Sequence, residues 1–518
     1  MLIVFFIFSL RVAFCFSQTL KTIPLHLDKT DCIFGKIAWV SNNRFCIAFD
    51  NNRQNHVVFI FDSTGKVIHD PVVWESKYFC QDEYFLVLGT TVFFLYGGAN
   101  NVDAHEFSIT DMITPDGIDH HSLERIFYIS HNKENKKLNE PAYSFRAYRG
   151  VNGQKALLTY NNDYKGLYKE GFRYRILSED GKLSGEDTLN LPYPDVECNI
   201  DDVIYDDAED CIYLLGDLFL FTNADKRAFK NSFIGSYSCK SKSYSEISTD
   251  IPSFYKNKIQ HTGTNHSFAF TGLQIDETSS KNWSESFLVF RTNPLEIVHA
   301  SSIHLKPESV TGFFDSNNKL QKEYILPVNF SLAKDSTYFV GWTRFFRLNQ
   351  MEQKSNRVEI IGGAWALFGV IGAIAASAAI EGKARYKDLN PALWLSYSPE
   401  KKLLFENISS SSLRSKKYYA HSYASFLMQG VATSIMNKPL EEDNTLSSVS
   451  ISKFSKGSYS VDSIAHSFLS DLHVNTIYPG SLFSDKNKNY FLGEYDPELD
   501  TMYHMNKVAH KYFLVEIE

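Results

Sequence analysis

No short motif in this sequence specifies a chemistry. The chain has no serine in a G-x-S-x-G turn and no glycine-rich phosphate loop, which argues against an enzyme without excluding one whose site is assembled from distant loops. Its seven cysteines include no C-x-x-C pair, so a zinc or redox motif is not supported. Basic residues do not cluster and the net charge is -8, so nucleic acid is not an expected partner. We predict no catalytic residue and no cofactor.

Aromatic residues, in contrast, are abundant. The chain holds 41 Phe and 29 Tyr, and aromatic side chains suit the pleated, half-buried surface of a sheet. Charged residues make up 22% and apolar residues 44% of the chain, which is ordinary for a folded protein. The composition therefore favours an all-β fold.

A unit of apolar strand, polar turn and second strand recurs along the chain. It is clearest at 55–68, where the turn is predicted at Asp62–Gly65. Further units are predicted at 84–112, 155–189, 211–247, 267–303, 337–408, 422–464 and 489–518. The second hairpins of successive units start roughly 45–70 residues apart, except across one gap that holds an insertion, and this period is typical of propeller blades.

The repeats predict a seven- to eight-bladed β-propeller, because each unit alone would expose an apolar face that a neighbouring blade can bury. The final unit lacks an outer strand, and 19–27 is a predicted strand without a partner. Pairing these two segments would close the ring and remove an exposed edge. A set of β-sandwiches is the alternative, but it does not explain why the two chain ends complement each other.

One local pattern points to a group of proteins. Residues 201–216 combine a strand, an acidic turn and a second strand, and in this they resemble secreted bacterial β-propeller repeat proteins of unknown function. The resemblance is one of architecture: there is no WD dipeptide, YWTD motif or Asp-box, and the kelch-like end Tyr96-Gly97-Gly98 occurs once. It implies a fold and no activity.

Residues 1–17 are predicted to be a signal peptide, cut before Gln18, with Cys15 and Ser17 at positions -3 and -1. Arg11 falls inside the apolar run and no basic residue precedes it, so a short anchor is the alternative. The propeller then comprises residues 18–518. We expect an exported protein, in the periplasm or at the cell surface.

Export would permit disulfides. Six cysteines follow the signal peptide, and Cys198 could pair with Cys211 across a hairpin. Buried free thiols are the alternative.

The most specific feature is a Gly/Ala-rich apolar insertion at 348–390. Within it, Ile360–Ile380 holds 21 residues without a charge, which as a helix would be ~30 Å long. The predicted membrane or partner contacts are its large apolar residues, Trp365, Leu367, Phe368, Val370, Ile371 and Ile374. Its small residues have the spacing of close helix packing: Gly369, Gly372, Ala373 and Ala376.

The position of this insertion limits its role. It interrupts a hairpin formed by 337–346 and 392–397, whose two strands should pair in one blade, so a single membrane crossing conflicts with the fold. Three interpretations remain: a helical hairpin that dips into a membrane, a contact with another protein or another copy of the chain, and a structural helix lying on the propeller.

The acidic run around 195–210 contains the weak candidate ligands for a cation, Asp206, Asp207, Glu209 and Asp210. Ca²⁺ prefers such oxygen ligands, but the spacing of an EF-hand is absent and a solvated hairpin turn is the favoured interpretation.

These observations predict an exported, non-catalytic propeller that binds or scaffolds at the cell envelope, with the 360–380 segment touching membrane, an envelope protein or a second copy. The alternative is a propeller hydrolase or lyase that acts on glycan or peptide at the central funnel. Carboxylates and histidines converging at one end of the ring axis would distinguish it.

Overall fold

The structure of the chain is a computed structural model. It describes residues 20–27, 32–41, 44–51, 55–70, 72–75, 85–101, 104–114, 117–119, 124–130, 144–161, 169–222, 226–249, 255–256, 259–262, 266–274, 283–306, 325–332, 338–344, 388–398, 403–413, 423–428, 431–439, 447–455, 458–464, 476–485, 488–495 and 511–517.

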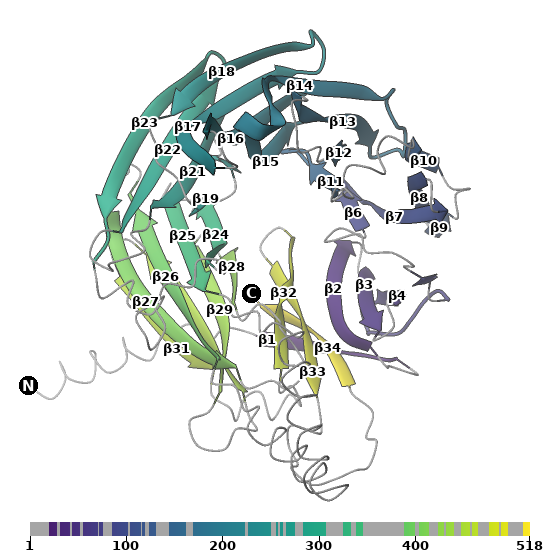
Figure 1. Cartoon of the computed structure of the whole chain (residues 1–518). Helices are drawn as coiled ribbons and strands as arrows, with labels where there is room; N and C mark the ends of the chain where they lie inside the picture. The colour runs from purple at the N-terminus through teal and green to yellow at the C-terminus, as the bar shows by residue number, and fades with distance from the viewer. Residues whose placement is uncertain are drawn as a thin grey trace, which may run out of the picture.

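The described strands form eight small antiparallel sheets, which succeed one another around a common centre (Figure 1). In chain order, the first sheet comprises β2(Cys32–Ser41), β3(Arg44–Asn51), β4(Asn55–Asp62) and β5(Val72–Glu75). The second comprises β6(Phe85–Leu88), β7(Thr91–Asn101), β8(Ala104–Thr114), β9(Gly117–Asp119) and β10(Glu124–Ser130). The third comprises β11(Ser144–Arg149), β12(Lys155–Asn161), β13(Lys169–Ser178) and β14(Asp187–Pro194), and the fourth comprises β15(Cys198–Asp206), β16(Cys211–Thr222), β17(Lys226–Ser238) and β18(Ser243–Thr249).

The remaining four sheets continue the series. The fifth sheet comprises β19(Tyr255–Lys256), β20(Gln260–His261), β21(Ser267–Gln274), β22(Ser284–Thr292) and β23(Leu295–His304). The sixth comprises β24(Ile325–Leu332), β25(Tyr338–Arg344), β26(Asp388–Tyr397) and β27(Leu403–Leu413), and the seventh comprises β28(Tyr423–Met428), β29(Val431–Pro439), β30(Ser447–Ser455) and β31(Ser458–Ile464). The eighth comprises β32(Thr476–Asp485), β33(Lys488–Tyr495), β34(Lys511–Ile517) and β1(Leu20–Leu25). This succession of four- and five-stranded antiparallel sheets is the architecture of a β-propeller, and the predicted all-β fold is confirmed.

The last sheet takes its outer strand from the start of the chain. β1 pairs antiparallel with β34, from Leu20 opposite Ile517 to Leu25 opposite Tyr512. The predicted pairing of the two chain ends is therefore confirmed, and β2 of the first sheet also contacts β32 of the last.

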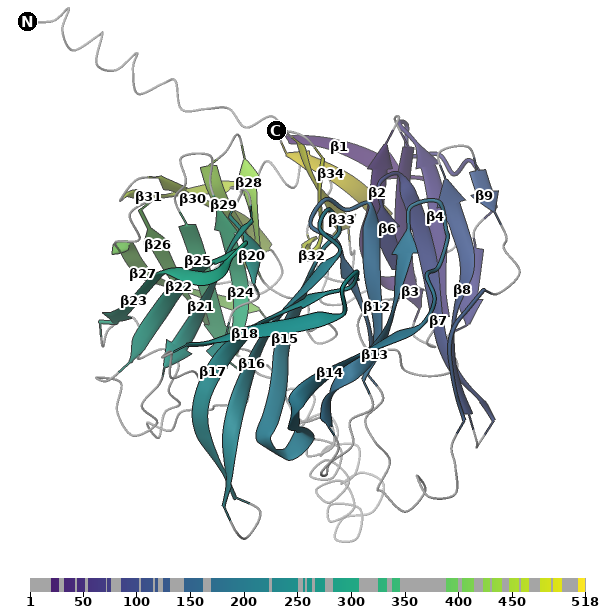
Figure 2. The same ribbon diagram turned by 90° about the horizontal axis from the view of Figure 1, so that it is seen from above.

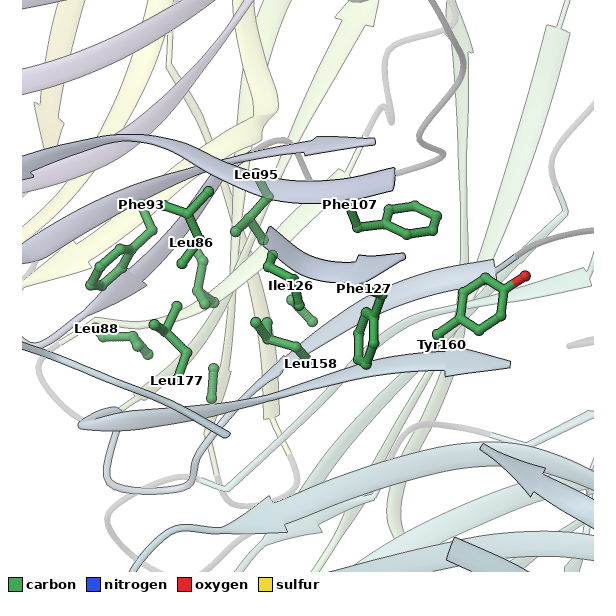
Figure 3. Close-up of a cluster of buried hydrophobic side chains, with 13 residues drawn as sticks. Leu86, Leu88, Phe93, Leu95, Phe107, Ile126, Phe127, Leu158, Tyr160 and Leu177 are labelled. Atoms are coloured by element: carbon green, nitrogen blue, oxygen red, sulfur yellow. The ribbon is translucent and has the colours of Figure 1, made fainter. Parts of the chain in front are cut away.

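The core lies between neighbouring sheets, because the middle strands bury both faces. On β12, Leu157 packs toward the β15–β18 sheet, whereas Leu158 packs toward the β6–β10 sheet. Figure 3 shows the second of these clusters, in which Leu158 and Tyr160 meet Phe107 and Phe127. Successive residues of a strand point to opposite faces, so a strand covered on both sides has a continuous apolar run, as 155–160 has.

The turn in the clearest repeat forms as predicted. Asp62 accepts hydrogen bonds at Oδ1 from the main-chain N–H of Thr64 at 2.8 Å and of Lys66 at 3.1 Å, the bonding typical of aspartate at a turn. The strand expected after the turn differs: Val67 makes only an isolated bridge, and the outer strand β5 begins at Val72.

The hairpin that carries the predicted insertion is intact. β25 and β26 pair from Tyr338 opposite Tyr397 to Thr343 opposite Ala392, as the sequence predicts. β26 begins at Asp388, so the last three residues of the predicted insertion, 388–390, belong to a strand that pairs with β27. The apolar segment at 360–380 lies outside the described ranges, and in the part of the chain described here no helix is long and apolar enough to cross a membrane.

Candidate functional site

On one face of the sheet assembly, turns of neighbouring sheets form hydrogen bonds with one another. These turns, around residues 89–90, 150–154, 179 and 205–210, are called the turn belt below. The turns that join the first and second strands of three consecutive sheets bond to one another: Gly89 N–H donates to the carbonyl of Gly153 at 2.8 Å, and Val151 N–H donates to the carbonyl of Tyr205 at 3.0 Å. Glu179, in the turn between β13 and β14, accepts a hydrogen bond from the N–H of Thr90 at 3.1 Å. These turns therefore lie on the same face.

Asp207 is the most heavily used carboxylate of the belt. It lies in the β15–β16 turn, and its two oxygens accept hydrogen bonds from the main-chain N–H groups of Asn152 at 2.8 Å, Gln154 at 3.0 Å and Lys155 at 3.2 Å, all in the neighbouring sheet. Gly150 packs so closely that a Cβ there would lie 2.5 Å from Cγ of Asp207. Asp207 thus joins two sheets by accepting hydrogen bonds from main-chain N–H groups that would otherwise be left without this acceptor.

Asp210 joins the same two sheets through charge. Its carboxylate accepts hydrogen bonds from Nζ of Lys155 at 2.8 Å and from the hydroxyl of Tyr205 at 2.9 Å, and Lys240 lies 3.4 Å away. Burial by itself raises the pKa of Asp210, but the bonds from Lys155 and Tyr205 outweigh it, and the net pKa is lowered. The carboxylate is therefore ionised at neutral pH.

The two other candidate cation ligands also have structural surroundings. Asp206 accepts hydrogen bonds from the N–H groups of Ala208 and Glu209, and the side chain of Glu209 is exposed. Within the described ranges, no three His, Cys, Asp or Glu side chains are grouped to hold a metal ion. The acidic run acts here as a turn and a joint between sheets.

The predicted disulfide between Cys198 and Cys211 is not formed. Cys198 is opposite Leu218 at one end of the β15–β16 pair, Cys211 is opposite Asp206 at the other end, and both are free thiols, as are Cys46 and Cys239. Burial and then the charge of Glu170 raise the pKa of the Cys198 thiol. A thiol in such surroundings stays protonated and is inert. Cys46 and Cys198 are buried, as the alternative interpretation expects, whereas Cys211 and Cys239 are only partly buried.

A buried pair that sequence reasoning missed joins two further sheets. The hydroxyl of Tyr397 on β26 donates to Oε2 of Glu285 on β22 at 2.5 Å, and Glu285 is fully buried. The Tyr397 ring stacks on Phe287, with ring centroids 5.0 Å apart. In the sequence, the only sign of this buried pair is a glutamate within the apolar strand 284–292. That pattern does not identify Tyr397 as its partner.

This pair yields a test. Tyr397→Phe keeps the stacked ring but removes one donor to a buried carboxyl group, so we expect the free energy of unfolding to fall by about 1–2 kcal/mol. Urea denaturation of the variant measures the change. In a Glu285→Gln background the same substitution should cost less, and an equal cost in both backgrounds would show that the hydrogen bond is not the source.

The face opposite the turn belt carries the connections between second and third strands. Strand direction alternates in each antiparallel sheet, so these connections leave at the other end from the first turns. They include the long β16–β17 hairpin, which extends past the neighbouring sheets (Figure 2). The ends of β25 and β26, which flank the apolar insertion, have the same position in their own sheet. The predicted contact and packing residues from Trp365 to Ala376, like the signal peptide, lie outside the described ranges.

Comparison with known proteins bears on architecture alone. No protein-family model matches the chain, and no curated protein matches it. Among solved structures it is similar to the WD40 domain of SCAP from fission yeast, with 10% identity over 96% of this chain and 98% of that one and a TM-score of 0.38. It is also similar to the β-propeller domain of the Trilobed protease from Pyrococcus furiosus, with 8% identity, 88% and 100% coverage and a TM-score of 0.36. The tricorn protease is a third, with 12% identity, 87% and 36% coverage and a TM-score of 0.37. We take no function from these similarities.

Proposed function

We propose that the chain is an exported, non-catalytic protein that binds or scaffolds at the cell envelope, and that its eight sheets are the blades of a closed propeller. The observation that carries the proposal is the intact pairing of β25 with β26 on either side of residues 345–387. Because β25 and β26 pair on both sides of these residues, the hairpin does not depend on the apolar run at 360–380 for its pairing. A run of this length is costly to leave in water and serves best as a contact with membrane, an envelope protein or a second copy.

The buried polar groups support a binding role over a catalytic one. Asp207 is engaged by main-chain donors, Glu285 by Tyr397, and Asp217 by the hydroxyl of Ser232 at 2.6 Å. Each of these bonds joins strands or neighbouring sheets. The carboxylates therefore serve to hold the scaffold together.

Replacement of residues 348–387 by a short Gly/Ser loop tests the role of the insertion. We expect the full chain to stay in the membrane pellet of expressing cells after washes with high salt and alkali, and the loop variant to become soluble with unchanged circular dichroism. A matched control replaces 496–510, another connection between second and third strands, with the same loop and should stay in the pellet. If the full chain and the loop variant are both soluble and elute at the same size, the insertion is structural and the proposal is wrong.

A further inference from the structure

β23 is the outer strand of the fifth sheet and lies on the outside of the sheet assembly (Figure 1). It pairs with β22 on one side, and no strand in the part of the chain described here pairs with its other edge. The strand is ten residues long and presents a row of main-chain N–H and C=O groups at this edge. Such an edge is a template for pairing with a further strand.

This edge lacks the features that usually block such pairing. Proline interrupts two other outer strands, at Pro24 of β1 and at Pro192 and Pro194 of β14. β23 contains neither proline nor lysine, and its one acidic residue, Glu296, forms an ion pair with Arg291 at 3.0 Å. Since proline and lysine are the residues that most often protect an edge strand, β23 is open to pairing.

Two large apolar side chains are exposed next to each other on β23. A β-bulge between the pairs Val289–His299 and Phe290–Ile297 adds Val298 to the strand. Ile297 is 37% exposed and Val298 is 44% exposed. They are two of the three large apolar side chains that the described residues leave exposed. An apolar pair at an open sheet edge is suited to burial against another strand.

The sequence of β23 is complementary to a second copy of itself. In an antiparallel pair with a two-fold axis at Ile297, counted without the bulged residue, Glu296 of each copy lies opposite His299 of the other. Both residues are on the same face of the sheet, because their partners on β22 are. An imidazole N–H can donate to the carboxylate, and a protonated histidine adds opposite charge. On the other face, Leu295 lies opposite Ala300, beside the two isoleucines.

We propose that β23 is a self-association site, at which two copies of the chain pair edge to edge with Ile297 against Ile297. The two fifth sheets then form one continuous sheet across the two-fold axis. Ile297 and Val298 of both copies are buried between them. The site is separate from the 360–380 segment and goes beyond the proposed function.

Sedimentation velocity tests the association. It is measured over a wide range of concentration, for the purified full chain and for the variant with 348–387 replaced, and we expect a monomer–dimer equilibrium in both. Ile297→Lys should raise the dissociation constant of the dimer by about ten-fold or more, because it removes two apolar contacts and places like charges opposite each other. Leu220→Lys is the matched control: Leu220 is 52% exposed but lies where β16 extends past β15 and β18. It should leave the equilibrium unchanged.

Cysteine substitution tests the register. Ile297→Cys should form a disulfide-linked dimer on oxidation with copper phenanthroline, because directly opposite residues of an antiparallel pair have Cβ atoms about 4.5–5.5 Å apart. Ser302→Cys is exposed on the same strand but lies far from its copy in this register, so it should not form the dimer. The unaltered chain controls for the cysteines already present.

Each contrary result has a distinct meaning. A chain that stays monomeric at every concentration overturns the proposal. A dimer that Ile297→Lys leaves unchanged, and that disappears when 348–387 is replaced, also overturns it, because the contact then lies on the insertion. If the chain is monomeric and Ile297→Lys abolishes binding of one envelope protein, β23 pairs with a foreign strand and the assignment to a second copy is wrong.

Discussion

Replacing Asp207 with alanine is expected to lower the free energy of unfolding by about 3 kcal/mol. The substitution removes the side-chain acceptor of three main-chain N–H groups at 2.8–3.2 Å, all in the next sheet. Those donors stay packed between two turns and gain no equivalent partner, so the loss is larger than that of one surface hydrogen bond. The change is measured as a shift in the urea midpoint at constant slope.

Two further variants show whether the joint between sheets is responsible. Gly150→Ala should destabilise in the same direction, because the added Cβ would lie 2.5 Å from Cγ of Asp207 and displace the carboxylate. Glu209→Ala removes an exposed carboxylate from the same turn and should change the stability by less than about 0.5 kcal/mol. Equal losses for Asp207→Ala and Glu209→Ala would mean that the net charge of the turn matters and the hydrogen bonds do not.

Substitution of Ile23 by aspartate is expected to destabilise the protein by more than about 4 kcal/mol. Ile23 is buried on β1, in a cluster with Leu25, Leu492 and Leu514 that holds the two chain ends together. The variant places a carboxylate in that cluster and detaches β1, which leaves β34 as an open edge. Thermal unfolding and size-exclusion chromatography should show a lower midpoint and self-association.

His26→Asp is the matched control, since the His26 side chain is exposed and only its main-chain N–H bonds to Gly65. It should leave the midpoint nearly unchanged. A synthetic peptide covering 18–27 should restore stability to a chain that lacks residues 1–27, because it supplies the missing strand. Failure of the peptide to bind, together with a stable truncated chain, would contradict a structural role for the terminal pairing. The predicted cleavage before Gln18 removes none of β1, which begins at Leu20.

The repeated hairpins could be predicted from the sequence, because each depends on neighbours along the chain. Apolar runs such as 155–160 and turn residues such as Asp62 identify hairpins, and the strand left over at each end identifies the terminal pair. The strand that was expected directly after Asp62–Gly65 is displaced to Val72–Glu75, since a single favourable turn does not fix where the next strand resumes pairing.

The candidate site was only partly predictable. Asp207 and Asp210 were singled out for their charge, yet their partners in the neighbouring sheet, within residues 152–155, lie more than 50 positions earlier and are brought close by the packing of two sheets. The distance between Cys198 and Cys211 is set by strand register, which places them at opposite ends of one pair.

The sequence by itself determined the all-β fold and the repeated hairpins, because turn chemistry and apolar alternation act over a few residues. It also indicated the pairing of the chain ends, because each end left a strand without a partner. Only the tertiary structure decided that the acidic run joins two sheets, that Glu285 meets Tyr397, and that β16 and β17 outrun their neighbours to expose Leu220. The physical reason is the same in each case. These features depend on which sheet lies against which and where each flanking strand stops, and no local pattern of residues encodes either.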